Sequence, residues 1–325
     1  MDMHTVTRRV ALAAAALALA APAAFAQGYP NKPVRVVVPQ PPGGGFDNVG
    51  RLIADRMSKL TGQSFVVENK TGSGTLVGTD FAAKAPADGY TLLIGSVSNI
   101  ALNPGLYPQL PYDSLKDFEP VGLLVAYSYT LVGRKDLPMK TLQEVVAYAK
   151  ANPGKLNYAS GGVGSGQHVL AAALWHLAKV DVAHVPYRGA QAAYQDLLGG
   201  RVDLFFDLSP TARVQVDAGN VKALAVSGPQ RNPMHPQVPT VQETGTPLEL
   251  ESWFGLFAPA KTPPDVLAKL RADFAKVAAM PDVQEGLVKA GGKPMALVGD
   301  DARALVRRDT EQWTRLVKTM GIRAE

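Results

Sequence analysis

The sequence predicts an α/β protein built from two lobes, and three observations lead to that prediction. Short runs of β-branched residues alternate with stretches whose apolar residues recur at helical spacing. The alternation breaks off and then resumes, which divides it into two series. The chain has 325 residues, of which 46% are hydrophobic and 19% charged, and this is enough for one large or two medium domains. We therefore expect two lobes with a cleft between them.

The first series of predicted elements lies between residues 34 and 96. The run at 34–39 is rich in valine, which is typical of strands buried in parallel sheets. At 46–60 the apolar residues recur on one face of a predicted helix. Strands at 64–69 and 90–96, with a Gly/Ser turn between them, continue the pattern. We expect these residues to form one α/β lobe.

The second series follows Pro120 and begins with a helix at 142–154. Successive β–α units of this length imply a parallel sheet with right-handed crossovers. The proline-rich residues 229–251 predict an irregular surface stretch, residues 253–260 one more strand, and the chain from Pro263 onward helices. The units themselves are predicted as strands at 156–160, 183–187, 202–207 and 222–228 and helices at 168–180, 191–200 and 211–219.

Residues 1–26 have the pattern of a secretory signal peptide. Arg8 and Arg9 precede an alanine-rich apolar run, and Ala24-Phe25-Ala26 supplies small residues for cleavage before Gln27. A transmembrane anchor is the alternative, but the run is shorter than the roughly 20 residues that a membrane span needs. We therefore expect an exported protein.

The composition excludes several kinds of chemistry. The chain has no cysteine, so thiolate catalysis, cysteine-held zinc and iron–sulfur clusters are excluded. Without the signal peptide, 31 basic and 27 acidic residues remain, a net charge of +4, and the basic residues are scattered. We expect no nucleic-acid partner, while mild attraction for anionic solutes remains possible.

The loop PQPPGGGFD, from Pro39 to Asp47, follows the first strand and opens a helix. Glycines let the backbone approach a ligand closely, and the first N–H groups of a helix favour an anion. The loop lacks the Gly-Lys-Ser/Thr ending of a Walker loop, and Asn48 stands where a dinucleotide fingerprint needs its third glycine. A plain strand–helix turn is the alternative, and Asp47 fits either a helix cap or a ligand contact.

A second loop of this kind is YASGGVGSGQH, residues 158–168. Ser165 between two glycines resembles the nucleophile elbow of a serine hydrolase, but Val163 stands where that motif needs a glycine. No downstream histidine has a recognisable context. The serines and glycine amides of the loop serve equally well as hydrogen-bond donors to a ligand. An exported hydrolase that uses Ser165 is kept as an alternative.

A third loop, VPYRGAQ, carries Arg188, which can bind a carboxylate through two parallel hydrogen bonds or pair with a surface acid. Asp207 ends another predicted strand, where it can accept from a ligand or cap the next helix. His168, His176 and His184 are spaced by eight residues, which does not place two ligands on one helix face. We therefore expect no metal site.

Taken together, these motifs resemble one known family. The chain contains, in order, PPGGGFDNVGRLIADRMSKLTGQSFVVENKTGSG, PADGYTLL, LPYDSLKDFEPV, YAKANPGKLNYASGGVGSGQH, HVPYRGAQAAYQDLLGGRVDLFFD, VPTVQETG and FGLFAPAKTPPDVLAKL. This succession covers nearly the whole mature chain and is similar to the receptors of tripartite tricarboxylate transporters, also called Bug-type solute-binding proteins. The resemblance implies a two-lobed periplasmic binding protein of type II, the Venus flytrap fold, and a receptor rather than an enzyme.

The resemblance also implies how such a receptor works. Residues 27–126 and 258–325 would form lobe 1, and residues 127–257 lobe 2. The lobes would close over a small carboxylate-bearing organic acid and present it to membrane permease subunits, with no cofactor and as a monomer. A ligand-sensing subunit of a signalling system would use the same closure, so that alternative stays open.

The family's pattern assigns binding roles to residues of both lobes. Phe46 departs from it, because many relatives have threonine or serine there, and an aromatic ring would narrow the pocket. By matching motif, lobe 1 would contribute Gly43, Gly44, Gly45, Asp47, Ser96 and Asn99, and lobe 2 would contribute Ser160, Gly164, Ser165, His168, Tyr187, Arg188, Gly189 and Asp207.

Overall fold

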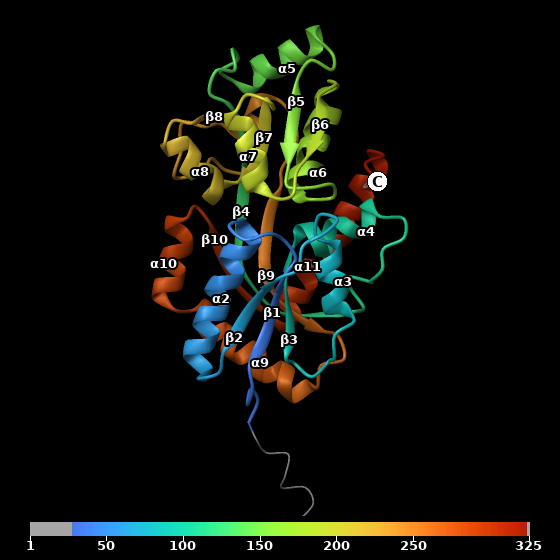
Figure 1. Cartoon of the computed structure of the whole chain (residues 1–325), viewed down its shortest axis with the longest axis vertical. Coiled ribbons are helices and arrows are strands. Elements are labelled where there is room, and N and C mark those ends of the chain that lie inside the picture. Colours follow the sequence, from blue (N-terminus) through green and yellow to red (C-terminus); the bar gives the residue numbers. More distant parts are fainter. Residues whose placement is uncertain (1–27, 324–325) are drawn as a thin grey trace, which may run out of the picture.

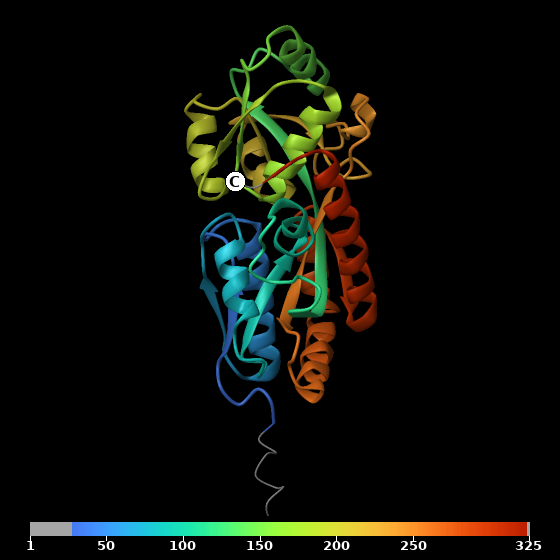
Figure 2. The same cartoon turned by 90° about the vertical axis from the view of Figure 1, so that its right-hand side faces the viewer.

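Two β-sheets that share one strand organise the chain, of which the structure, a computed structural model, describes residues 28–323. The shared strand is β4 (Phe118–Arg134), which is 17 residues long. Figures 1 and 2 show it running from the lower lobe into the upper one. The predicted signal peptide at 1–26 lies outside the described residues.

Lobe 1 is built on a sheet with the strand order β2-β1-β3-β9-β4-β10. Its helices cover both faces of that sheet, and α11 runs along one side (Figure 2). Its elements are β1 (Val34–Val38), α2 (Gly45–Thr61), β2 (Phe65–Asn69), α3 (Leu76–Ala83), β3 (Thr91–Ser96), the π-helical turn η2 (Val97–Leu102), α4 (Asn103–Leu106), β9 (Glu251–Pro259), α9 (Pro264–Ala278), α10 (Pro281–Lys289), β10 (Lys293–Val298) and α11 (Gly299–Thr319).

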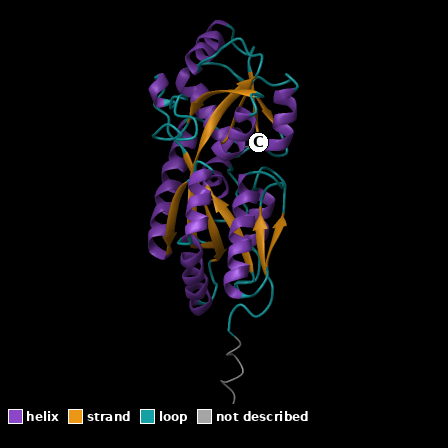
Figure 3. Cartoon of the chain, turned by 90° about the vertical axis from the view of Figure 1, so that its left-hand side faces the viewer, coloured by secondary structure: helices purple, strands orange, loops and turns teal. Residues whose placement is uncertain are grey.

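Lobe 2 is built on a sheet with the strand order β8-β4-β7-β5-β6. Its β5 and β6 strands are parallel, as are β5 and β7. Figure 3 shows the two lobes stacked along the long axis of the molecule. The elements of lobe 2 are α5 (Leu142–Ala151), β5 (Asn157–Ser160), α6 (Gly166–Ala178), β6 (Ala183–Pro186), α7 (Ala190–Leu198), β7 (Leu204–Leu208), α8 (Ser209–Asp217), β8 (Val221–Val226) and the short 3-10 helix η3 (Gln242–Thr244).

Helix α2 illustrates how local sequence sets an element that the site depends on. Val49, Ile53 and Met57 recur on one face and are buried against the sheet. The helix ends at Gly62, whose left-handed backbone (φ 72°) lets its N–H reach the carbonyl of Ser58. The predicted helix at 46–60 is thus confirmed to within one residue at each end.

The prediction of a parallel sheet is correct for the first strands of each lobe and wrong for the strands that join the lobes. β9 runs antiparallel to β3 and β4, and β4 runs antiparallel to β7, β8 and β10. The prediction that the chain is entirely helical after Pro263 is also wrong, because β10 pairs with β4 there. The sequence does not predict this strand, because glycine and proline are typical of turns and the segment contains Gly291, Gly292 and Pro294.

The chain passes between the lobes through β4 and β9. The predicted crossing points, after residues 126 and 257, fall inside these two strands. Residues 254–257 of β9 pair with β3 of lobe 1, and Tyr129 of β4 already pairs with β7 of lobe 2. Among residues 28–323, no helix is long and apolar enough to cross a membrane.

Candidate ligand-binding site

A cavity of about 320 Å³ lies where loops of the two lobes meet. The loops follow β1 and β2 in lobe 1 and β5 and β6 in lobe 2, so the cavity lies at the carboxyl ends of parallel strands. Open α/β sheets bind ligands at this edge. The cavity is lined by Pro41, Thr71, Gly72, Ser73, Gly74, Gly161, Tyr187, Arg188 and Gly189.

The two lobes touch one another around this cavity. The hydroxyl of Ser98, in η2, accepts from the amide of Gly166, at the start of α6, over 3.0 Å. Gly74 lies so close to Val163 that a Cβ on Gly74 would overlap the Val163 carbonyl oxygen. A Cβ on Gly45 would likewise overlap the Leu208 side chain. The structure therefore represents lobes in contact across the cleft.

The glycine loop presents backbone donors at the start of α2. Gly43 has a left-handed backbone (φ 86°), which favours glycine. Gly44 is the N-cap and supplies no side chain to the helix. No hydrogen bond links the amides of Gly44, Gly45 or Phe46 to another described residue. These N–H groups and the positive end of the helix dipole can bind an anion.

Asp47 stabilises this loop through its carboxylate. Its Oδ2 accepts from the Gly43 amide at 3.0 Å and from Arg51 Nε at 2.9 Å, and its Oδ1 accepts from Asn69 Nδ2 at 3.0 Å. Burial alone would raise the pKa of Asp47, but these hydrogen bonds outweigh it and hold the pKa below its usual value. The carboxylate is therefore ionised and already bound by the protein.

The other predicted side chains of lobe 1 are also occupied within the protein. Ser96 accepts from Ser98 N, and Asn99 Oδ1 accepts from Ser96 N, so the two form a capping box at the start of η2. Both are fully buried. Phe46 packs edge-to-face on Phe254, with ring centroids 5.1 Å apart, and is 3% exposed. It therefore belongs to the core next to the cleft.

The loop between β5 and α6 is held by side chains beneath it. Ser165 is the N-cap of α6 and accepts from His168 N at 3.3 Å. Gln167 accepts from the Gly161 amide at 3.0 Å and donates to Asp207 Oδ1 at 3.1 Å. Asp207 thus fixes the loop through Gln167, although it lies at the end of a different strand.

Asp207 itself is a buried residue of β7. Besides the bond from Gln167, it accepts from Leu208 N at 2.9 Å and from Thr211 Oγ1 at 2.5 Å. Burial raises the pKa of Asp207, and the hydrogen bonds from Thr211 and Gln167 offset part of that rise. Its side chain is therefore an internal support of the loop.

Two histidines stack below the same loop. The rings of His168 and His184 lie 4.1 Å apart at 16°, and Tyr158 stacks on the other side of His184 at 4.9 Å. Gly164 N donates to His168 Nδ1 at 3.3 Å. Burial lowers the pKa of His168 to about 4, and burial together with the neighbouring His168 lowers that of His184 to about 3. Both rings are neutral at pH 7.

These contacts bear on the hydrolase alternative. The Ser–His contact in this region joins His184 Nε2 to the hydroxyl of Ser160, over 2.7 Å, and not to Ser165. Ser160 also bonds to the backbone of Gly162, at both its carbonyl and its amide. Ser165 is buried and engaged as a helix cap. The side chain that the hydrolase alternative requires as a nucleophile is therefore committed to the fold.

The third loop supplies the cation of the cavity. Arg188 is exposed and has no ion pair or hydrogen bond to its side chain among residues 28–323. Gly189 is the N-cap of α7 (φ 96°), so this helix also begins without a side-chain cap. Tyr187 donates to Asp196 Oδ2 at 2.7 Å, and burial, followed by this contact with Asp196, raises its pKa to about 12.

Of the predicted site residues, Tyr187, Arg188 and Gly189 line the interlobe cavity. Gly43 and Gly45 are not in its lining but face lobe 2, where they approach Gln191 and Leu208. The sequence reading did not single out Ser98, Gln167 or the loop at 71–74. The loop at 71–74 could have been recognised as part of the site, because it is rich in glycine and serine and follows a strand. No group of three or more potential metal-ligating side chains occurs in the part of the chain that the structure describes.

The fold and this cleft define a class, the two-lobed solute-binding proteins. Residues 49–322 match the model of the tripartite tricarboxylate transporter family receptors, and the chain belongs to that family. The predictions of this family, of its two-lobed fold and of a receptor rather than an enzyme are thereby confirmed.

Three solved structures are similar over most of their length. The periplasmic binding protein BugD is 35% identical (TM-score 0.86) over 91% of this chain and 99% of that one. Rpa4515 of R. palustris, solved with adipate, is 32% identical (TM-score 0.85) over 90% of this chain and 99% of that one. MatC of Rhodopseudomonas palustris, with bound malate, is 35% identical (TM-score 0.83) over 89% of this chain and 100% of that one.

Proposed function

We propose that this protein is a periplasmic receptor that binds a small carboxylate-bearing organic acid between its lobes. It would deliver that acid to the permease subunits of a tripartite tricarboxylate-type transporter. The observation that supports binding is that Arg188 and the uncapped start of α7 lie at an interlobe cavity, while the uncapped start of α2 faces lobe 2 with Gly43 near Gln191. Free backbone amides and an unpaired guanidinium are groups that bind carboxylates.

The ligand class that we propose is a small dicarboxylate. The cavity of about 320 Å³ is at the small end of the range for ligand pockets. Adipate and malate, which are named with two similar structures, are both dicarboxylates. In this chain, Arg188 and the amides at the start of α7 would bind one carboxylate, and the amides of Gly44 to Phe46 the other.

Closure would provide the signal that the receptor is loaded. A ligand that bridges both lobes stabilises the closed state by its differential affinity for that state. Export by the signal peptide predicted at 1–26 and action as a monomer belong to the same proposal. The side chains of Asp47, Ser96, Asn99 and Asp207 would support the site from beneath, because each is already engaged by the protein.

Calorimetric titration tests the proposal with adipate, malate and the neutral diamide adipamide. The two dicarboxylates should compete for one site, and adipamide should not bind. Arg188→Ala should weaken binding by roughly tenfold to a hundredfold, because a charge-assisted contact is lost. Arg315→Ala removes an exposed arginine of α11 and should leave binding unchanged. Equal affinity of the Arg188 variant and the wild type would contradict the proposed site.

The transport role has a separate test. Deleting the gene should abolish cellular uptake of whichever dicarboxylate the protein binds, and the wild-type gene should restore that uptake. Binding without any effect on uptake would remove the transport part of the proposal and leave the binding part intact.

A further inference from the structure

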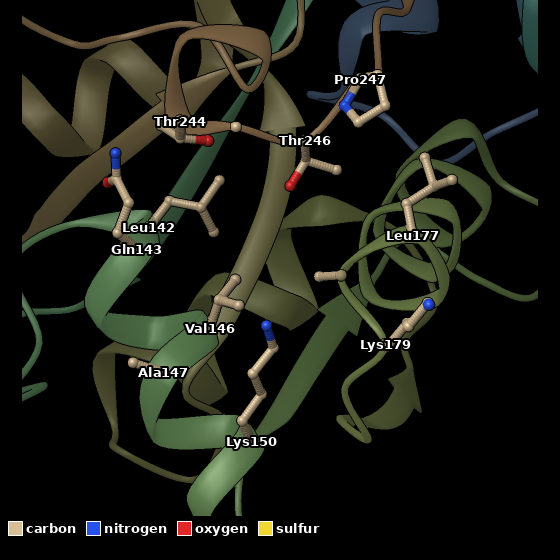
Figure 4. Close-up of a pocket in the computed structure, with 12 residues that line it drawn as sticks. Leu142, Gln143, Val146, Ala147, Lys150, Leu177, Lys179, Thr244, Thr246 and Pro247 are labelled. Atoms are coloured by element: carbon tan, nitrogen blue, oxygen red, sulfur yellow. The ribbon is translucent and has the colours of Figure 1, made fainter.

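A second cavity, of about 420 Å³, lies in lobe 2 away from the loops of the cleft. It is enclosed by α5, by the end of α6 and by the segment at 244–247 (Figure 4). All of these elements belong to lobe 2, so opening the cleft does not dismantle it. The cavity is lined by Leu142, Gln143, Val146, Ala147, Lys150, Leu177, Ala178, Lys179, Thr244, Gly245, Thr246 and Pro247.

About half of the wall of this cavity is apolar, and the rest is polar or charged. Val146 is half-buried and Pro247 exposed at its edge, while Leu142 is buried. Leu177 is 38% exposed, one of the few large apolar side chains on the described surface that are not covered. Such exposed apolar surface within a concave site favours a ligand with an apolar part.

The charged residues of the lining are both cations. Neither Lys150 nor Lys179 has an ion pair or a side-chain hydrogen bond among residues 28–323. Figure 4 shows them on opposite sides of the cavity, with Lys150 extending from α5 into the space below Thr246. Each lysine also lies at a helix end, where a cation complements the helix dipole. The dipole explains their position but not the partly exposed Leu177 in the same lining.

We propose that this cavity is a second binding site, specific for a small anion with an apolar body, such as a short-chain monocarboxylate. The carboxylate would lie against Lys150 or Lys179, and the alkyl chain would cover Val146 and Leu177. A small anion without an apolar body would leave Val146 and Leu177 exposed to water, which disfavours it. The site therefore differs from the interlobe cavity in selectivity, and it does not depend on the function proposed for that cavity.

The test uses the mature chain with ¹³C-dimethylated lysines, assigned through Lys150→Arg and Lys179→Arg. Three probes are titrated separately and observed by NMR: hexanoate, acetate and hexylamine. Hexanoate should shift the Lys150 and Lys179 signals in a saturable way. Acetate, which lacks the apolar body, and hexylamine, which has the wrong charge, should not. Equal shifts with acetate would mean unspecific ion pairing and would overturn the proposal.

Two variants and a matched control complete the test. Lys150→Ala with Lys179→Ala should weaken hexanoate binding at least about tenfold. Lys135→Ala with Lys155→Ala removes the same charge from exposed positions of lobe 2 outside the cavity and should have no effect. Leu177→Glu should abolish binding without lowering the melting temperature, since the residue is partly exposed. Hexanoate that still binds to the Leu177 variant, or that shifts only signals outside the cavity, would refute the proposal.

Discussion

The hydroxyl of Ser98 accepts the amide of Gly166 across 3.0 Å, and this bond joins η2 of lobe 1 to the first residue of α6 in lobe 2. It is buried and can exist only while the lobes are in contact. Part of the free energy of the closed state therefore comes from protein–protein contacts that need no ligand. A ligand has to supply only the remainder.

Removing this bond should shift the receptor toward the open state. Ser98→Ala is expected to weaken dicarboxylate binding by roughly twofold to tenfold, the effect of one net hydrogen bond. Calorimetry measures the affinity, and small-angle scattering measures the change in shape. Ser114→Ala is the matched control, because Ser114 is also a buried serine of lobe 1 but its hydroxyl has no hydrogen-bond partner within residues 28–323. Identical affinities of the two variants would argue against a role for the bond.

Gly74 should be necessary for closure. Its backbone is left-handed (φ 70°), and an added Cβ would overlap the Val163 carbonyl oxygen of the opposite lobe. We expect Gly74→Ala to hold the lobes apart and to weaken ligand binding by more than about tenfold. Gly62→Ala imposes the same backbone strain (φ 72°) where nothing lies within 4 Å. If both variants lose affinity equally, strain and not interlobe contact is responsible.

Asp47 should control the order of the glycine loop. Asp47→Asn keeps the shape but removes the charge that Arg51 and the Gly43 amide bind, so we expect a loss of about 1–3 kcal/mol in the free energy of unfolding. Because the pKa of Asp47 is lowered in the folded state, its contribution is present above about pH 4 and disappears as pH falls through the folded-state value.

Urea melts at pH 7 and pH 3 test this prediction. The difference between wild type and Asp47→Asn should be larger at pH 7 than at pH 3. Asp55→Asn on the same helix, where the acid is exposed and pairs with Lys59, should change stability little at either pH. A constant difference at both pH values would show that the charge of Asp47 is not the cause.

The stacked histidines should make stability depend on pH between about 6.5 and 4. In this interval the unfolded chain takes up protons at His168 and His184 while the folded protein keeps both rings neutral. Unfolding is therefore favoured as pH falls, by about 1.4 kcal/mol per pH unit for each ring. His168→Gln with His184→Gln should flatten that slope in urea melts. His176→Gln, at an exposed position, should leave it unchanged.

The repeating β–α units could be predicted from sequence because each one carries its own pattern. The strands at 34–39 and 64–69 and the helices at 46–60 and 168–180 were predicted close to their observed bounds. β4 was not predicted, since Pro120, Gly122 and Gly133 interrupt a run that tertiary pairing on both edges makes a strand. Pairing between distant segments leaves no local signal.

The site residues, too, could be predicted from the sequence only in part. Sequence indicated three of the four loops that meet, because each of these follows a strand and is rich in glycine or contains Arg188, but it did not indicate the loop at 71–74. It could not indicate which side chains the protein itself engages. Asp47 and Asp207 look like ligand contacts in the sequence, yet each is held by three hydrogen bonds within the fold. Only the folded arrangement distinguishes a supporting carboxylate from a recognising one.

The strand shared by the two sheets has a mechanical consequence. β4 is hydrogen-bonded to β9 up to Ser128 and to β7 from Tyr129 onward, so no loop interrupts the ladder where the lobes join. Rotation of one lobe relative to the other must then be taken up as a change in strand twist, distributed over several residues. The joint therefore resists rotation elastically, and this resistance limits how far the lobes can separate while the ladder along β4 stays hydrogen-bonded.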